Sequence, residues 1–408
     1  MSERIIKESF SKVKQDILNL ASENSDVKRE LQEIKRLLES LNNNVKNNED
    51  DYEAKKDWEE ISIPGRLCLF GEHSDWAGGH RRQNDELERG YTIVAQTNQK
   101  IYARIRKLDE PIFRFKSALS PEPLEIEMDE QKLVRIARQG EIFSYVAGTA
   151  YEILTSYKNI KHFGVEIDNY KNELPVKKGL SSSASVCVLT VKAFDSLFKL
   201  NLTKKRRMEL AYFGENNTPS RCGKMDQACA YDNPVMMIFD GDKIDIKELN
   251  VGEDLYFLIV DLKKAKNTVK ILKSLSDGYP FPNKKNKIEI EKMNYLGNIN
   301  KNIALRARQA IEEGDAKKIG ELMKEAQKNF DRYLMPACPE ELSAPKLHKV
   351  LNYPKIKKLV HGGKCIGSGG DGSLQLICKS KEDREKAKEI LECELDVNCL
   401  YLDLKKTL

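Results

Sequence analysis

The sequence predicts an α+β protein of two domains that follow a long N-terminal helix. A chain of 408 residues is longer than one typical domain. Stretches rich in β-branched residues alternate with segments of helical spacing after residue 58. The first 63 residues, in contrast, contain neither glycine nor proline. We therefore divide the chain into a helix with a polar tether at 1–57, an N-terminal domain at 58–250 and a C-terminal domain at 251–408.

Composition restricts the class of protein and its partners. The chain is 40% hydrophobic and 33% charged, which is typical of a globular protein. It has no apolar run that could span a bilayer and no signal-peptide core, so we expect a cytoplasmic protein without a membrane partner. A net charge of +5 is small for this length and does not indicate nucleic-acid binding. The nine cysteines form no C-x-x-C pair, which favours reduced thiols over disulfides or structural zinc.

The N-terminal helix carries apolar residues at alternating spacings of three and four. This pattern runs through residues 6–45 and turns polar at Asn24. A heptad seam with one polar position is typical of a coiled coil, because a buried Asn fixes register and oligomer number. We therefore predict a homo-oligomer held by residues 6–45. The alternative is a single amphipathic helix that packs on its own chain.

The expected elements of the N-terminal domain follow from local composition. They are an extended stretch at 61–73 broken at Pro64–Gly65, paired strands at 91–107, a helix at 141–157, a strand at 163–168 and a helix at 186–197.

The expected elements of the C-terminal domain are a buried strand at 255–262, helices at 288–312 and 316–334, a glycine-rich segment at 362–373, a helix at 381–394 and a strand at 397–404. This β-α-α-β-α-β order suits helices on one face of an antiparallel sheet.

The segment "PVKKGLSSSAS" (175–185) places a glycine and consecutive serines between an extended segment and a helix. One interpretation is a serine N-cap, because serine oxygens accept hydrogen bonds from the first helical amides. The other is an anion site, since a helix N-terminus offers free N–H donors and glycine allows a phosphate to approach closely.

Three further segments accompany this loop: "PGRLCLFGEHSDWAGG" (64–79), "ENNTPSRCGKMDQ" (215–227) and "GGKCIGSGGDGS" (362–373). Neither a Walker A sequence nor the protein-kinase motif set is present. In this order, the four segments resemble those of the GHMP kinase superfamily, and "GRLCLFGEHSDW" with "CGKMDQ" is most similar to its galactokinase branch. The resemblance covers residues 58–408. It implies a ribosomal S5 domain 2-like N-terminal domain and a ferredoxin-like C-terminal domain, with ATP and Mg²⁺ as cofactors.

The resemblance also implies which residues hold the nucleotide and the metal. The ATP-binding residues would be those of the glycine-serine loop: Gly179, Leu180, Ser181, Ser182, Ser183, Ala184 and Ser185. The Ser183 hydroxyl and the Glu215 carboxylate would lie at Mg²⁺, a cation that prefers oxygen ligands. The alternative for Glu215 is an exposed glutamate at a helix end.

Asp226 and Arg66 are the predicted catalytic residues. Phosphoryl transfer needs an oriented acceptor hydroxyl and positive groups that offset charge on the transferring phosphoryl. By resemblance, Asp226 faces that hydroxyl and Arg66 lies beside it, where its charge keeps the carboxylate ionised. The alternatives are that Asp226 caps a helix and that Arg66 is a surface charge.

Glu72, His73 and Asp75 are the predicted substrate-binding residues. The family uses these positions for the sugar, and paired donors and acceptors discriminate hydroxyl groups. The same three residue types could instead bind a metal. The glycine-rich run 367–372 is implied to support the phosphate loop, and its alternative is a plain turn.

Two departures from the galactokinase pattern concern the acceptor. The chain inserts "HRRQNDELERG" (80–90), and Trp76 stands where tyrosine is usual. The acceptor therefore stays open between galactose and another sugar or cyclitol. The sequence predicts an ATP-dependent kinase for a sugar-like hydroxyl. The alternatives are a catalytically silent binding module assembled by the coiled coil, and a mevalonate-type kinase.

Overall fold

The computed structural model describes residues 58–175, 179–220 and 222–407. The predicted coiled coil at 6–45 and its tether lie outside the described residues. Contacts divide the chain into residues 1–59 and residues 60–408, and the description below concerns the second unit.

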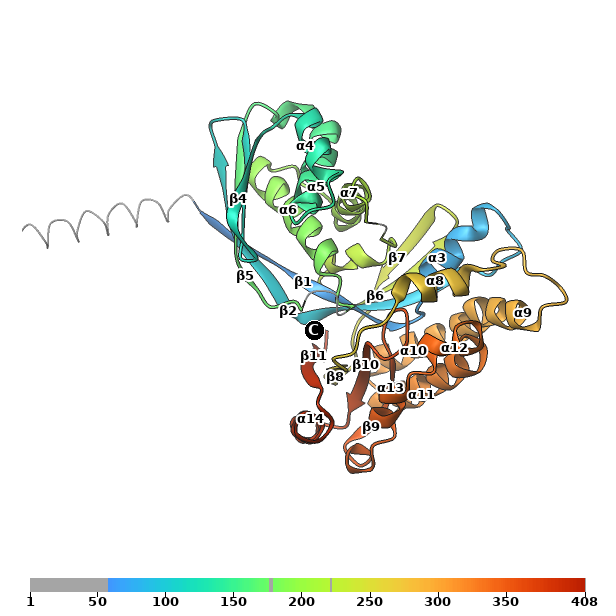
Figure 1. The fold of residues 1–408 in the computed structure, drawn as a ribbon. Helices are drawn as coiled ribbons and strands as arrows, with labels where there is room; N and C mark the ends of the chain where they lie inside the picture. The colour runs from blue at the N-terminus through green and yellow to red at the C-terminus, as the bar shows by residue number, and fades with distance from the viewer. Residues whose placement is uncertain (1–57, 176–178, 221, 408) are drawn as a thin grey trace, which may run out of the picture. The chain divides into compact units, whose positions relative to one another are not determined.

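Seven strands form the first sheet, in the order β4-β3-β5-β2-β6-β7, with β1 paired to β2 (Figure 1). The strands are β1 (Glu59–Phe70), β2 (Gly90–Leu108), β3 (Ile112–Ser117), β4 (Ser120–Glu127), β5 (Gly164–Asn172), β6 (Val235–Asp240) and β7 (Lys243–Glu248). β3 runs parallel to β5, and β2 runs antiparallel to both β5 and β6.

The expected break at Pro64–Gly65 is wrong, because β1 continues through it. A side chain at position 65 would not fit, since its Cβ would lie 2.6 Å from Leu174 Cδ2 and 2.7 Å from the Leu180 carbonyl oxygen. The Gly65 amide donates to Thr97 Oγ1 at 2.9 Å. Glycine here therefore permits close packing of an extended strand.

The paired strands expected at 91–107 are one strand, β2, of 19 residues. Its first part pairs with β6 over 90–94, and its last part pairs with β5 over 101–108. No glycine or proline interrupts residues 91–107, so neither of the two strongest breakers of regular structure occurs there.

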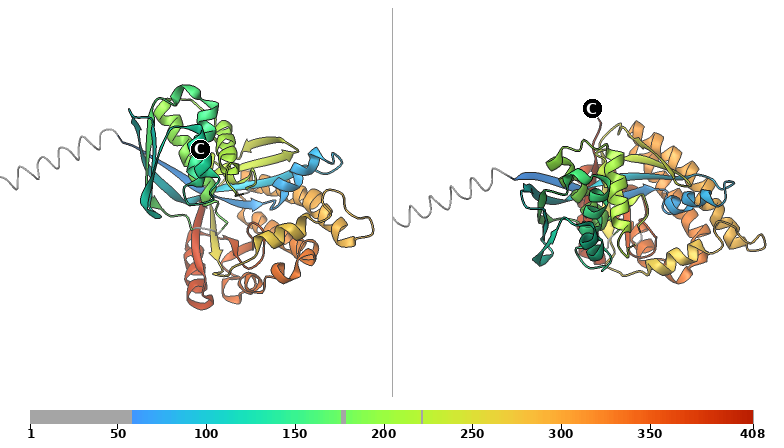
Figure 2. Two further views of the ribbon diagram at one scale, coloured as in Figure 1. Left: turned by 45° about the horizontal axis from the view of Figure 1, so that its top comes forward. Right: turned by 90° about the horizontal axis from the view of Figure 1, so that it is seen from above.

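Helices cover one face of this sheet (Figures 1 and 2). The helices of this half are α3 (Ser74–Gly79), α4 (Glu130–Ala137), α5 (Ser144–Ser156), α6 (Ser182–Phe198) and α7 (Lys204–Asn216). The helices predicted at 141–157 and 186–197 are confirmed as α5 and α6. α6 contacts β2 and β5 and buries most of its apolar side chains.

The second sheet has the order β11-β8-β10-β9, and each neighbouring pair is antiparallel. Its strands are β8 (Leu255–Asp261), β9 (Val360–Cys365), β10 (Ser373–Cys378) and β11 (Asn398–Leu404). The predicted order omitted one strand, because the glycine-rich segment 362–373 contains the turn between β9 and β10. Gly367, Gly369 and Gly370 have positive φ there, a conformation that glycine adopts without steric cost.

The helices of this half are α8 (Thr268–Ser276), α9 (Lys287–Asn294), α10 (Asn300–Glu313), α11 (Ala316–Tyr333), α12 (Pro339–Leu342), α13 (Pro345–Leu351) and α14 (Lys381–Leu395). The helices predicted at 316–334 and 381–394 are confirmed as α11 and α14. The helix predicted at 288–312 is α9 and α10, joined by a π-helical turn at Tyr295–Ile299.

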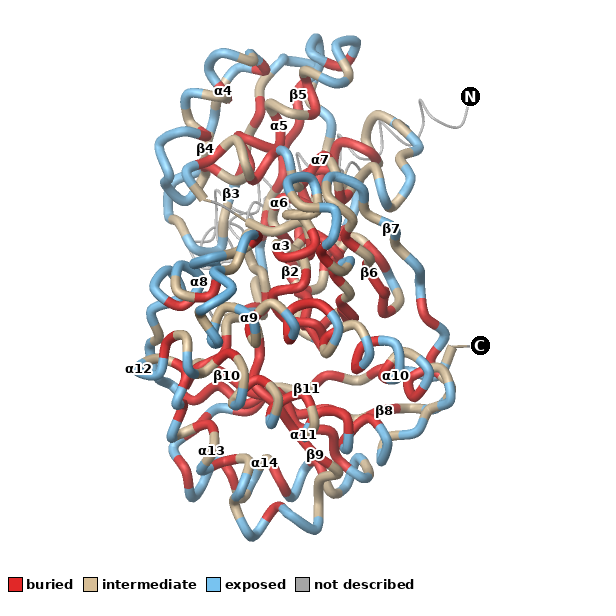
Figure 3. The backbone as a smooth tube through the Cα atoms, turned by 90° about the vertical axis from the view of Figure 1, so that its right-hand side faces the viewer, coloured by how far each residue is buried: buried red, intermediate tan, exposed pale blue. Residues whose placement is uncertain are grey.

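One hydrophobic core passes through both sheets. It includes Leu67 and Ile93 from the first sheet, Phe257 and Ile259 from the second, and Ile303 from α10. Figure 3 shows these central strands as largely buried, whereas α8 is largely exposed. The two halves of residues 60–408 therefore pack as one body.

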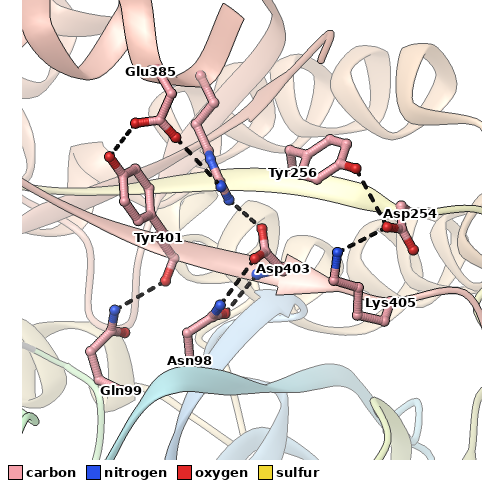
Figure 4. Close-up of polar contacts among 9 residues, drawn as sticks. Asn98, Gln99, Asp254, Tyr256, Glu385, Tyr401, Asp403 and Lys405 are labelled. Atoms are coloured by element: carbon pink, nitrogen blue, oxygen red, sulfur yellow. Dashed lines mark hydrogen bonds and ion pairs between the residues drawn. The ribbon is translucent and has the colours of Figure 1, made fainter. Parts of the chain in front are cut away.

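Polar contacts also join the edge strand β11 to the middle of β2 (Figure 4). The Asp403 amide donates to Asn98 Oδ1 at 2.7 Å, and Gln99 Nε2 donates to the Tyr401 carbonyl at 3.2 Å. Gln375 of β10 donates to the Cys68 carbonyl of β1 at 2.9 Å. These bonds fix the second sheet against the end of β1, where the predicted acceptor residues begin.

No helix in the described part of the chain is long and apolar enough to cross a membrane.

Candidate active site

A cavity of about 630 Å³ lies where the four motif segments meet. Its lining comes from residues 66–80, 179, 222–226, 266–276 and 366–368. A larger cavity of about 750 Å³, between α7 and the β6–β7 hairpin, contains none of the predicted site residues. The smaller cavity is therefore the candidate active site.

Arg66 and Asp226 form an ion pair on one wall of the cavity. They are 160 residues apart in sequence, and Arg66 Nε donates to Asp226 Oδ1 at 3.0 Å, with Nη2 bonded to the same oxygen. Arg66 Nη1 donates to the Gly179 carbonyl at 2.8 Å. Burial alone would lower the pKa of Arg66, but the charge and hydrogen bond of Asp226 raise it above its ordinary value. Arg66 therefore stays charged and holds the glycine-serine loop in place through the Gly179 carbonyl.

Neither structural alternative for these two residues agrees with the structure. Arg66 is buried rather than on the surface. Asp226 begins a short 3-10 helix, Asp226–Ala230, whose N-cap is Met225 and which has no side-chain cap. The Asp226 carboxylate accepts from Arg66 and from Ser181 Oγ, at 2.9 Å for the latter, and it faces the cavity.

The glycine-serine loop leads into α6 through two left-handed residues. Gly179 has φ +80°, and Ser181, the N-cap of α6, has φ +54°. Ser181 does not cap with its side chain, because its hydroxyl donates to Asp226. The amides that follow begin a helix and so have no intrahelical acceptor. A cap alone therefore does not account for the serines, and the free donors suit an anion.

Leu180 and Ser185, near the two ends of the predicted ATP-binding segment, form hydrogen bonds to other residues of the protein. The Leu180 carbonyl accepts from the Arg66 amide at 3.1 Å, and the Leu180 side chain is buried. The Ser185 amide donates to the Ser181 carbonyl at 3.0 Å, and the Ser185 hydroxyl donates to the Pro64 carbonyl at 2.9 Å. The amides of Ser182, Ser183 and Ala184, in the first turn of α6, are among the donors left for a ligand.

Ser183 and Glu215 lie together on the other side of this loop. The Ser183 hydroxyl hydrogen-bonds to Glu215, and Gln227 Nε2 donates to Glu215 Oε2 at 2.8 Å. Glu215 is 1% exposed, which excludes the exposed helix-end alternative. Burial, and then the charge of Asp226, raise the pKa of Glu215. Two carboxylates thus lie near each other with one arginine, an arrangement that a divalent cation would stabilise.

The described residues include no group of three His, Cys, Asp or Glu side chains that could hold a metal ion. This excludes a complete protein-ligated metal site at Glu72, His73 and Asp75. Mg²⁺ is usually bound by one or two carboxylates together with substrate phosphates. Glu215 and Ser183 fit that donor set.

Glu72 lines the opposite end of the cavity and pairs with Lys364 of β9. Both side chains are 3% exposed, and Lys364 Nζ also donates to the Cys365 carbonyl at 2.9 Å. Burial raises the pKa of Glu72 against the opposing pull of the ammonium. The pair therefore joins the end of β1 to the second sheet.

His73 is buried in this wall and is neutral. Burial, and then the charge of Lys266, lower its pKa to about 4. Trp76 Nε1 donates to His73 Nδ1 at 3.2 Å, so the proton of the neutral ring is on Nε2. Nε2 is buried, and the backbone of Ser368 is nearby but outside hydrogen-bond geometry.

Asp75 follows Glu72 closely in the sequence, and its carboxylate lies near that of Asp226. Burial, and then the charge of Asp226, raise its pKa to about 6. A Cβ at position 223 would overlap Asp75 Oδ2, so glycine in "CGKMDQ" permits this approach.

The inserted segment 80–90 is held on the sheet rather than extending freely. Arg81 Nε and Arg89 Nε donate to the Asp240 carboxylate at 2.7 and 2.9 Å. Asn84 Nδ2 donates to the Pro280 carbonyl at 3.0 Å. The rings of Trp76, His80 and Tyr279 pack edge to face with centroids 5.4–6.1 Å apart. The insertion thus shapes the acceptor end of the cavity.

Sequence reasoning missed Lys266, Lys364 and Tyr279. Lys266 and Tyr279 flank α8 and lie outside the four motif segments. Lys364 lies within "GGKCIGSGGDGS", a segment in which the sequence-based expectation concerned the glycine-rich run and not the lysine. No spacing pattern would have indicated either lysine.

Comparison with known proteins agrees with this arrangement. Residues 144–233 match the family model "GHMP kinases N terminal domain". A galactokinase of Thermococcus kodakarensis is 26% identical over 356 residues, which cover 81% of this chain and 93% of the relative.

Solved structures show the same fold. The galactokinase of Lactococcus lactis, complexed with galactose, has a TM-score of 0.64 at 20% identity and covers 86% of this chain and 94% of its own. The mevalonate kinase of Methanococcus jannaschii has a TM-score of 0.64 at 19% identity, with 86% and 98% covered. Residues 144–233 thus match the N-terminal domain of the GHMP kinases, and over most of its length the chain is similar to galactokinases.

Proposed function

We propose that the chain transfers the γ-phosphoryl group of ATP to a hydroxyl of a sugar or sugar-like molecule. The observation that carries this proposal is the Arg66–Asp226 pair, which lies between the glycine-serine loop and the predicted acceptor residues. Phosphoryl transfer requires these three parts to meet at one point.

Asp226 orients the acceptor hydroxyl and accepts its proton. Oδ1 is occupied by Arg66 and Ser181, and no described residue hydrogen-bonds to Oδ2. Oδ2 is therefore the oxygen for the substrate. Arg66 orients the Asp226 carboxylate and places positive charge next to the transferring group.

The amides of Ser182, Ser183 and Ala184 hold the phosphates at the N-terminus of α6. Ser183 and Glu215 hold Mg²⁺, which, when bound, offsets the charge of the phosphate oxygens. Glu72, His73 and Asp75 bind the acceptor. The hydroxyl groups of a sugar suit this set, because it offers both a neutral N–H donor and carboxylate acceptors.

The experiment is a screen of ATP consumption with the purified chain against monosaccharides, uronic acids, inositols and mevalonate. Turnover with a sugar or cyclitol supports the proposal. Turnover with mevalonate alone would replace it with a mevalonate-type kinase. Absence of turnover together with intact ATP binding would favour a silent binding module.

The remaining expectations from sequence stand as proposals. Residues 58–250 and 251–408 act as the two domains of a cytoplasmic enzyme, and residues 6–45 assemble it into a homo-oligomer. Light scattering of the full chain and of a chain lacking residues 1–57 tests the assembly. Equal monomeric masses would contradict it.

A further inference from the structure

Lys266 is a cation in the cavity wall that lacks an acidic partner. Its stem lies over the glycine-rich run, where a Cβ at Gly372 would be 2.8 Å from Lys266 Cε. Its Nζ donates to the Gly369 carbonyl at 2.8 Å, and no ion pair among the described residues includes it. Burial lowers its pKa, and the carboxylate that acts on it, Glu72, is already paired with Lys364. The fold therefore holds an ammonium group in place without neutralising it.

The position of Lys266 is at the acceptor end of the cavity. Gly369, whose carbonyl accepts from Lys266 Nζ, packs on Phe330, because a Cβ at this glycine would overlap the Phe330 ring. The ring centroids of Phe330 and His73 are 6.3 Å apart. The charge of Lys266 also contributes to the lowered pKa of His73. Lys266 is therefore near His73, one of the predicted acceptor residues.

The charges around the cavity do not balance at this end. Asp226 is paired with Arg66 and Glu72 with Lys364. The third carboxylate of the lining, Asp75, is near Asp226 and is not among the groups that act on Lys266. Two lysines of the lining have no carboxylate partner among the described residues: Lys266 and Lys273, which is exposed in the last turn of α8. A negative group on a bound molecule would supply the missing partner and would also accept from His73 Nε2.

We propose that the acceptor carries an anionic group, a carboxylate or a phosphate, in addition to the hydroxyl that is phosphorylated, and that Lys266 Nζ binds this group. The inference rests on the proposed function, because it assigns one end of the cavity to the acceptor. It narrows the substrate class from sugars in general to acidic sugars and similar hydroxy acids.

The test compares matched acceptors that differ in this group. They are D-galacturonate against D-galactose, D-glucuronate against D-glucose, and both hexose 6-phosphates, with mevalonate as a hydroxy acid that is not a sugar. We expect kcat/KM to be at least about 10-fold higher for a charged member than for its neutral counterpart. The uronates and the 6-phosphates separate a carboxylate from a phosphate.

Variants of Lys266 make the test specific to this residue. Lys266→Met should lower kcat/KM for the charged acceptor by about 10- to 100-fold, mainly through KM, and Lys266→Arg should restore part of it. KM for ATP should not change. Lys263→Met is the matched control, because Lys263 pairs with the exposed Asp396 and does not line the cavity.

The outcomes separate this inference from the proposed function. Equal kcat/KM for neutral and charged sugars, or a Lys266→Met effect on KM for ATP, overturns the inference and leaves the sugar kinase. Lys266-dependent turnover of mevalonate supports the inference and contradicts the sugar kinase. If no acceptor is turned over, calorimetric titration with the uronates and 6-phosphates decides, and lack of Lys266-dependent binding overturns the inference.

Discussion

The cavity is bounded by two ion pairs that differ in what they leave open. The side chains of Lys364 and Glu72 are each 3% exposed, so this pair is almost fully enclosed and only Glu72 reaches the cavity wall. In the other pair, Arg66 is 9% exposed but Asp226 is 20% exposed. Three hydrogen bonds converge on Asp226 Oδ1, and no described residue bonds to Oδ2. One pair therefore joins two sheets, whereas the other leaves a carboxylate oxygen available to a ligand.

The difference shows that a buried ion pair indicates a catalytic role only when one of its charged groups remains accessible from a cavity. Burial of a pair has a desolvation cost that its own attraction roughly offsets, so burial by itself says little about purpose. A carboxylate oxygen held in the charged state and left free is suited to accept a proton. The predictions below test this distinction from the largest effect to the smallest.

Lys364→Met should unfold the protein more readily, because it leaves the Glu72 carboxylate buried without a partner. We expect a loss of about 3–5 kcal/mol in the free energy of unfolding. Glu72→Gln combined with Lys364→Met should recover most of this loss, since both charges are then removed. Denaturant titration of the three proteins measures it. A single variant as stable as the parent would show that the pair does not join the sheets as described.

Asp226→Asn should leave stability almost unchanged and lower kcat by about 10²- to 10³-fold, because it removes the proton acceptor but keeps the shape. The safer estimate is the lower part of the range for general bases, since a loose phosphoryl-transfer transition state depends less on proton removal. KM for ATP should change little. Turnover at saturating ATP and acceptor, with thermal melting as the folding control, measures both effects.

Arg66→Met should also slow turnover, and the double variant should lose less than the product of the two single losses, because both residues act on one transferring group. If Asp226→Asn melts normally and turns over at the parent rate, Asp226 does not accept the acceptor proton, and the proposed difference in role between the two ion pairs is wrong.

Asp75→Asn should stabilise the protein at neutral pH. The pKa of Asp75 is raised to about 6, so the folded state binds more protons than the unfolded state between pH 4 and 6, and stability falls as pH rises through that window. Removing the charge should therefore gain about 1–3 kcal/mol at pH 7.5 and almost nothing at pH 4. Melting curves at both pH values measure this, with the exposed Asp85→Asn as control. An equal gain at both pH values would contradict it.

Ser183→Ala should have the smallest effect, a rise of about 3- to 10-fold in KM for Mg²⁺-ATP, because one hydroxyl is lost from a loop whose other donors are amides. KM for the acceptor should not change. Ser117→Ala on β3, outside the cavity lining, is the control. An unchanged nucleotide and metal requirement would return Ser183 to a structural role.

Much of the candidate site could be predicted from the sequence. Arg66, Asp226 and the loop at 179–185 were chosen from short motifs, and the structure brings them together across 160 residues of sequence. They could be predicted because the motifs resemble those of the GHMP kinases and because their residue types suit phosphoryl transfer. Errors arose where tertiary neighbours rather than local pattern decide, as in β2, which changes its pairing partner halfway along.

The sequence by itself determined the types of elements and the chemical groups at their ends, because hydrophobic spacing and glycine positions act over a few residues. Only the tertiary structure decided that the Glu72 carboxylate has a lysine partner and that the Lys266 ammonium has no acidic partner among the described residues. Lys364 lies 292 residues from Glu72, and Lys266 is left without an acid because β9 brings the other lysine closer. Charge pairing depends on distances of a few ångströms between sheets, and those distances are set by how the shared core packs.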